Sequence, residues 1–270
     1  MWIGMTIKQR AMFKSQYKLG VTLAIFGIAV TALAQHGKER LPVENRTASL
    51  SIDNTAIVSN QNGSPAVAFR LTNKSKKAVL AYKVSINGTD LIREFFAPER
   101  ESILPGESDS NLLTPVDGIG IDLSSQTFYL KAAIFTDRSA EGDSASIEEL
   151  KTLRKGRLLA CRSMQPVLDE LVKEIQSDST HSNAADALST TIERLKSLPP
   201  DDSDGKPMQG KLASGFQDAV GAVTSEMESI FDNHLPQASI FGAVTAIIRR
   251  QDDKSKSFED FFRISGTTIH

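Results

Sequence analysis

The chain has 270 residues, and its 31 basic and 33 acidic side chains leave a formal net charge of −2. This length suits one large domain or two small ones. A slightly acidic chain without a basic patch argues against nucleic acid as a partner. One Cys excludes an intramolecular disulfide and a Cys-rich zinc site, and four His residues disfavour a multi-His metal site.

The first 34 residues have the order of a secretory signal peptide. Four basic residues and no acidic one precede an apolar run over 19–34, which ends in a small-x-small pattern at Ala34. We predict cleavage before Gln35 and export to the periplasm or the cell exterior. The alternative is an uncleaved anchor that would make the membrane a partner, although a spanning helix usually has roughly 20 apolar residues. Cleavage removes only basic charges and takes the net charge to −6.

Residues 35–47 are assigned to a linker, and residues 48–143 have the pattern of short strands. Val67, Phe69 and Leu71 alternate with Ala68, Arg70 and Thr72, which is the period of a strand with one apolar face. The runs 79–86 and 128–135 alternate in the same way. An earlier strand over 50–58 is expected to be broken at Asp53-Asn54.

Turn signals separate these strands. Asn87-Gly88 is a tight-turn pair, and Leu104-Pro105-Gly106-Glu107 fits a type II turn with Gly at the third position. Short strands with regularly spaced turns predict an antiparallel immunoglobulin-like β-sandwich. The Cys and Trp hallmarks of antibody domains are missing from this region.

From residue 144 the apolar spacing becomes helical, and 144–251 is predicted to be a helical region. A first helix begins near Ser144, with Gly156 weakening it and Pro166 expected to kink or divide it. Three more amphipathic stripes follow, over 184–195, 212–230 and 236–250. Residues 252–270 are predicted to be a charged C-terminal tail whose three Phe residues dock it onto the body.

The loop between the last strand and the first helix offers candidate metal ligands. Asp137, Glu141 and Asp143 lie close together with a Gly, and calcium prefers such oxygen-rich loops. The other interpretation is an ordinary turn, in which Asp137 bonds its own backbone and Asp143 caps the helix. No catalytic or cofactor-binding residue is assigned, and calcium is the only cofactor considered.

Three other segments have weaker chemical signals. The Gly-x-Gly run at 117–122 lacks the rest of a dinucleotide fingerprint and is expected to be a hairpin or bulge. The acidic run 201–205 lacks the Glu that a helix-loop-helix calcium site requires, so it is expected to be a solvated linker. Cys161 falls in an apolar helical stripe, where a buried, inert thiol is the usual state.

Three segments carry a resemblance: AVAFRLTNKSKKAVLAYKVSI, ILPGES and LKAAIFTDRSAEGD, the last followed by an arginine-bearing helix. Over about residues 63–160 the chain resembles a group of exported bacterial proteins with an immunoglobulin-like sandwich and no assigned activity. The chain departs from that group at Asp137-Arg138, where Asp-Gly is expected. The resemblance implies the fold and export, and it implies no activity.

Together these features predict an α+β protein with an N-terminal antiparallel immunoglobulin-like β-sandwich and a helical C-terminal region. The leading functional hypothesis is a non-enzymatic interaction or structural module of the cell envelope, with a protein partner or a second copy of the chain. The alternative is a metal-dependent enzyme that uses the acidic loop at 137–143.

Overall fold

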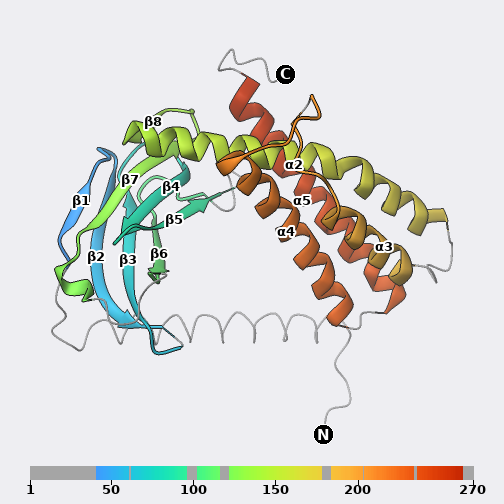
Figure 1. Ribbon diagram of the computed structural model, residues 1–270, viewed down its shortest axis with the longest axis horizontal. Coiled ribbons are helices and arrows are strands. Elements are labelled where there is room, and N and C mark those ends of the chain that lie inside the picture. Colours follow the sequence, from blue (N-terminus) through green and yellow to red (C-terminus); the bar gives the residue numbers. More distant parts are fainter. Residues whose placement is uncertain are drawn as a thin grey trace, which may run out of the picture.

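The computed structural model is an α+β structure in which β-sheets are followed by four helices (Figure 1). It describes these parts of the chain: 41–60, 62–95, 102–115, 122–177, 184–202, 204–233 and 236–263. The predicted signal peptide and most of the 117–122 segment lie outside the described residues. Within them, no helix is long and apolar enough to cross a membrane.

Two sheets form the N-terminal half. The first contains β1 (Val43–Asn45), β7 (Phe128–Phe135), β4 (Val79–Ile86) and β5 (Thr89–Glu94) in that order, and β8 (Ala140–Gly142) also pairs with β7. The second has the order β2 (Leu50–Ser59), β3 (Pro65–Asn73) and β6 (Ser108–Leu113). A short 3-10 helix, Leu123–Ser125, precedes β7.

The predicted strands and turns are confirmed at several positions. The register of β2 against β3 shifts between Ile52 and Asn54, where the sequence predicted a break. Asn87 and Gly88 both have positive φ, as the tight turn between β4 and β5 requires. Glu107 donates its N–H to the Leu104 carbonyl at 3.0 Å, and Gly106 has φ +82°, as in a type II turn.

The two sheets enclose one hydrophobic core, to which Val67, Phe69 and Leu71 contribute as predicted. The alternation predicted one face of β4 with Leu80, Tyr82, Val84 and Ile86, and one face of β7 with Phe128, Leu130, Ala132 and Ile134. These predicted faces are only partly correct. Leu80, Ala132 and Ile134 lie in a different cluster, on the outer face of the first sheet. The reason is that the β4–β7 register shifts twice, and each irregularity moves the following residues to the other face.

Two assignments at the edges of the domains need correction. The predicted linker 35–47 contains β1, which pairs in parallel with β7, so the first sheet is not wholly antiparallel. The predicted tail from 252 is instead the last part of helix α5 (Gln237–Arg263). Phe258 and Phe261 of that segment are buried, so the expected docking of its aromatic residues holds for these two.

The other helices are α2 (Ser144–Ser177), α3 (Ala184–Lys196) and α4 (Gly210–Asp232). Helix α2 is continuous through Gly156 and Pro166, so the proline does not divide it. In Figure 1, α2 begins above the first sheet and continues into the helical region. Its second half packs with α3, α4 and α5 around a separate hydrophobic core. The molecule thus has two cores, and α2 extends from one to the other.

Candidate functional site

The structure gives Asp137 and Asp143 the local roles that the turn interpretation predicted. Asp137 accepts hydrogen bonds from the backbone N–H and hydroxyl of Ser139 at 3.1 and 2.6 Å. The Lys77 ammonium lies 2.5 Å from the Asp137 carboxylate, and its hydrogen bond is the main reason that the pKa of Asp137 is lowered. Asp143 accepts the N–H of Ser146 at 2.9 Å, at the start of α2.

Glu141 has a longer-range role that the sequence did not predict. Its carboxylate accepts the N–H groups of Ala48 and Ser49 at 2.9 and 2.8 Å, and the Ser49 hydroxyl at 2.5 Å. It therefore fixes the chain just before β2. The carboxylates of the acidic loop are thus each engaged by different donors. Among the described residues, no group of three His, Cys, Asp or Glu is arranged to hold a metal ion.

Cys161 and the acidic run 201–205 also have structural roles, one in packing and the other in a turn. Cys161 is 3% exposed, and burial raises the pKa of its thiol to about 11, which fits the inert thiol expected from its position. Asp202 accepts the N–H groups of Asp204 and Lys206 at 2.9 Å each and closes a turn between α3 and α4.

A buried ionic centre joins the first sheet to the helices. The Glu94 carboxylate, at the end of β5, contacts Arg154 of α2 at 2.8 Å and also pairs with Arg157. The side chains of Glu94 and Arg154 are 3% and 0% exposed. Burial raises the pKa of Glu94 and lowers that of Arg154, while each charge offsets this effect on its partner.

Aromatic rings enclose the Arg154 guanidinium. Its central carbon lies 5.0 Å from the Phe258 ring centroid and 4.8 Å from that of Phe261, both on α5. Such cation–π contacts stabilise a desolvated guanidinium. Nε and Nη2 of Arg154 have no hydrogen-bond partner among the described residues. This arginine therefore connects β5, α2 and α5 through one charged group.

A second ion-pair network lies on the same sheet face. Lys83 of β4 contacts Asp90 of β5 at 2.7 Å and pairs with Glu149 of α2. Lys211 of α4 lies 2.6 Å from the other oxygen of Glu149. Burial acts to raise the pKa of Glu149, but the ammonium groups of Lys211 and Lys83 beside its carboxylate outweigh burial and lower that pKa. The two networks form an ionic seam, defined here as Lys83, Asp90, Glu94, Glu149, Arg154, Arg157 and Lys211.

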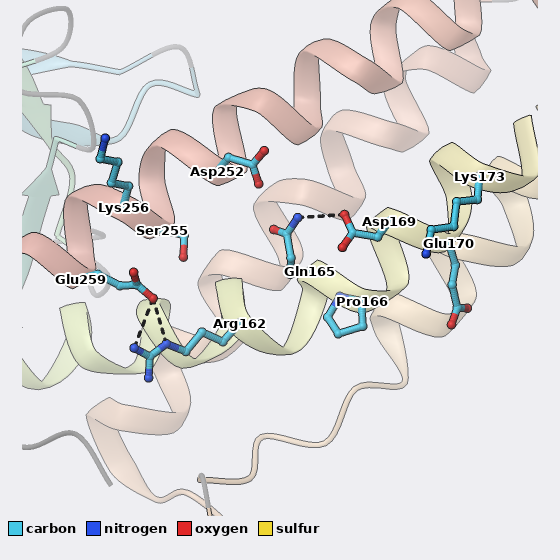
Figure 2. Close-up of a pocket in the computed structure, with 10 residues that line it drawn as sticks. All are labelled: Arg162, Gln165, Pro166, Asp169, Glu170, Lys173, Asp252, Ser255, Lys256 and Glu259. Carbon is cyan, nitrogen blue, oxygen red and sulfur yellow. Dashed lines mark hydrogen bonds and ion pairs between the residues drawn. The ribbon is translucent and has the colours of Figure 1, made fainter. Parts of the chain in front are cut away.

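A surface groove lies between residues 162–173 of α2 and residues 252–259 of α5, where the two helices run side by side (Figure 2). Its volume is about 820 Å³, and seven of its ten lining side chains are charged. An ion pair between Arg162 and Glu259, at 3.2 Å, bridges the two helices at one end. The groove was not predicted, because its walls come from two stripes nearly 90 residues apart in the chain.

Two groove carboxylates form no ion pair with the described residues, although Lys173 and Lys256 line the same groove. Asp169 accepts a hydrogen bond from Gln165 at 3.0 Å, and no cation in the described part of the chain pairs with it. Asp252 of α5 likewise has no ion-pair partner there. The groove is open, and it has Asp169 on its α2 wall, beside the Gln165 amide, and Asp252 on its α5 wall.

Comparison with known proteins gives no relative for this chain. No protein-family model, no curated protein and no solved structure matches it.

Proposed function

We propose that the protein is an exported, non-enzymatic interaction module of the cell envelope, built from an immunoglobulin-like sandwich and a helical region that binds a protein partner. The α2–α5 groove is the observation that carries this proposal. Enzyme and cofactor pockets are mostly enclosed and apolar, with a few convergent polar groups. This groove is open and mainly charged, as the polar, solvent-accessible rim of a protein interface is.

The order of the strands supports the immunoglobulin-like part. Strands β2, β3 and β6 form one sheet, β5, β4 and β7 lie in the other, and the short β1 and β8 both pair with β7. β2–β3 and β4–β5 are antiparallel neighbours in sequence, and the chain changes sheets before β2, β4, β6 and β7. Immunoglobulin-like sandwiches divide into sheets of three and four strands with crossing connections, and this chain has three and five because both short strands, β1 and β8, join the larger sheet.

The groove can be tested by photo-crosslinking in the producing cell. A photoreactive amino acid replaces Lys173, at the end of the groove, and in a matched protein it replaces Lys74, in the exposed turn after β3. We expect a discrete crosslinked species from position 173 and none from position 74. Crosslinking at neither position, or equally at both, would contradict a partner at this groove.

Export is tested separately on the same chain. The N-terminal sequence of the protein recovered from the periplasm or medium should begin at Gln35. Recovery of the intact chain from the cytoplasm would contradict export, and recovery of the intact chain from the membrane would support the uncleaved anchor.

A further inference from the structure

We infer that Asn87, in the turn between β4 and β5, is a site of spontaneous chemical modification, at which the side-chain amide is lost as ammonia and aspartate and isoaspartate are formed. The inference is independent of the α2–α5 groove. The sequence contains two Asn-Gly pairs, Asn87-Gly88 and Asn62-Gly63, and each is exposed and connects two strands. The structure gives the two pairs different hydrogen bonds, and this difference makes Asn87 the reactive one.

The reaction needs only these two residues and water. The backbone nitrogen of Gly88, after losing its proton to a base from solvent, attacks the side-chain carbonyl carbon, Cγ, of Asn87. The new C–N bond closes a cyclic imide, while the bond from Cγ to the side-chain nitrogen breaks, and that nitrogen takes up a proton and leaves as ammonia. Water then opens the imide. Addition of water at Cγ leaves aspartate, and addition at the backbone carbonyl leaves isoaspartate, in which the main chain runs through Cγ.

Nothing in the described part of the chain restrains Asn87 or the attacking nitrogen. Both residues of the turn are exposed. Neither the side-chain amide of Asn87 nor the N–H of Gly88 forms a hydrogen bond with the described residues. Gly88 has no side chain to shield its nitrogen, and even a Cβ there would meet no atom within 4 Å. Solvent therefore reaches the N–H, and no hydrogen bond of either residue has to be broken before the attack.

The Asn62-Gly63 pair is restrained at the atoms that would react. Gly63 donates its N–H to the Asn60 carbonyl at 3.0 Å, so the attacking nitrogen is held in a hydrogen bond. The side-chain oxygen of Asn60 also accepts the N–H groups of Asn62 and Ser64, at 2.9 Å each. Deprotonation of Gly63 and rotation of Asn62 each break a hydrogen bond, so this pair should react more slowly than the pair at 87 and 88.

The isoaspartate would change the turn that sets the register of β4 against β5. A two-residue turn of this kind fits the twist of its strands when both residues have positive φ, and Asn87 and Gly88 have φ +47° and +75°. Isoaspartate adds one carbon atom to the main chain of this turn. Asp90, which follows closely, belongs to the ionic seam and lies 2.7 Å from Lys83. Isoaspartate formation should therefore loosen the hairpin beside the seam and lower the thermal midpoint.

The test is ageing of the purified full chain in mildly alkaline buffer, followed by digestion and mass spectrometry of the peptides that contain Asn87 and Asn62. The mass shows replacement of the amide by a carboxylate, and chromatography separates aspartate from isoaspartate. In the folded protein, Asn87 should convert about fivefold or more faster than Asn62, which is the rate factor that corresponds to one net hydrogen bond. In urea the two sites should convert at similar rates, because each asparagine is then followed by an unrestrained glycine.

The control variant N87G removes the amide and keeps a residue that accepts positive φ. Its thermal midpoint should stay constant during ageing, whereas that of the wild type should fall as isoaspartate accumulates. Equal conversion of the two sites in the folded protein, faster conversion of Asn62, or no conversion of Asn87 while the urea-treated chain reacts would overturn the inference. A difference that persists unchanged in urea would also overturn it, because local sequence and not the fold would then be the cause. An equal fall of the midpoint in N87G would reject the effect on the hairpin.

Discussion

At the scale of single residues, we predict that substitution of Glu94 lowers the free energy of unfolding more than substitution of its buried partner Arg154 does. Glu94 is the carboxylate partner of both Arg154 and Arg157, whereas Arg154 is one of two cations beside Glu94. Glu94→Gln should therefore lower the free energy of unfolding by about 3–5 kcal/mol, because it leaves a buried guanidinium unpaired.

Arg154→Met should cost clearly less, because Glu94 keeps Arg157 and a methionine can pack beside Phe258 and Phe261. Urea denaturation of the two variants and the wild type measures both values. An equal loss in the two variants, or a larger one for Arg154→Met, would mean that the cation–π contacts outweigh the ion pair.

The acidic loop gives a prediction about calcium. Asp137, Glu141 and Asp143 already accept hydrogen bonds from Ser139, Ser49 and Ser146, respectively. We expect the thermal midpoint to be the same in calcium and in chelator, because a ligand stabilises a protein only when it binds the native state. A rise with calcium that disappears in an Asp137→Asn, Asp143→Asn variant would instead support the metal-dependent alternative.

Residue roles could be predicted where the partner is close in sequence. The contact of Asp137 with its own turn and the cap of Asp143 both join residues two or three positions apart. Glu141 bonds Ser49 across 92 residues, and Glu94 pairs with Arg154 across 60. Neither pair leaves a pattern in a single sequence, since the fold brings its members together.

At the scale of elements, two glycines set how closely α2 and α4 approach. A Cβ on Gly156 would overlap the carbonyl oxygen of Leu212, and one on Gly215 would overlap that of Leu153. Since backbone atoms cannot move aside without shifting a helix, Gly156→Ala or Gly215→Ala should lower the free energy of unfolding by about 1–3 kcal/mol.

Gly221 is the matched control on α4. A Cβ there would meet no atom within 4 Å, so Gly221→Ala should raise the free energy of unfolding by about 0.5–1 kcal/mol through helix propensity alone. Chemical denaturation of the three alanine variants checks the contrast. Stabilisation by all three would show that the helices have room to separate at no cost.

Element positions followed from the sequence wherever the periodicity was strong. The strands at 79–86 and 128–135 have the bounds that the alternation predicted. The short strand β1 was missed because three exposed residues carry no apolar pattern. Gly156 was interpreted only as a helix weakener, because a glycine's packing role depends on a neighbour that the local pattern does not show.

At the scale of the whole molecule, the core between the two sheets and the core of the helical region are joined by a small apolar cluster and by the ionic seam. The sequence left open whether the two regions share a core. It also could not reveal the groove, because α2 and α5 each look like an ordinary amphipathic helix with a solvated charged face. Tertiary packing, which brings the two charged faces together, creates the groove.

The ionic seam predicts how the stability of the whole molecule depends on pH. Burial alone would raise the pKa of Asp90 and Glu149, but their hydrogen bonds and ion pairs with lysines lower both. A carboxyl whose pKa is lower in the folded than in the unfolded state binds fewer protons when folded. Its contribution is present above the unfolded pKa of about 4 and is lost as the pH falls through the folded value.

Lys83→Met should therefore flatten the fall in unfolding free energy between about pH 5 and pH 2, because Asp90 and Glu149 lose a shared partner. The raised pKa of Glu94 contributes with the opposite sign, but it is present in both proteins and cancels in the comparison. Lys77→Met, which removes the partner of the more exposed Asp137, is the control and should change the slope less. Urea denaturation at a series of pH values gives the slopes. If the unfolding free energy of the wild type and of Lys83→Met has the same slope against pH, the loss of stability in acid does not come from the ion pairs between sheet and helices.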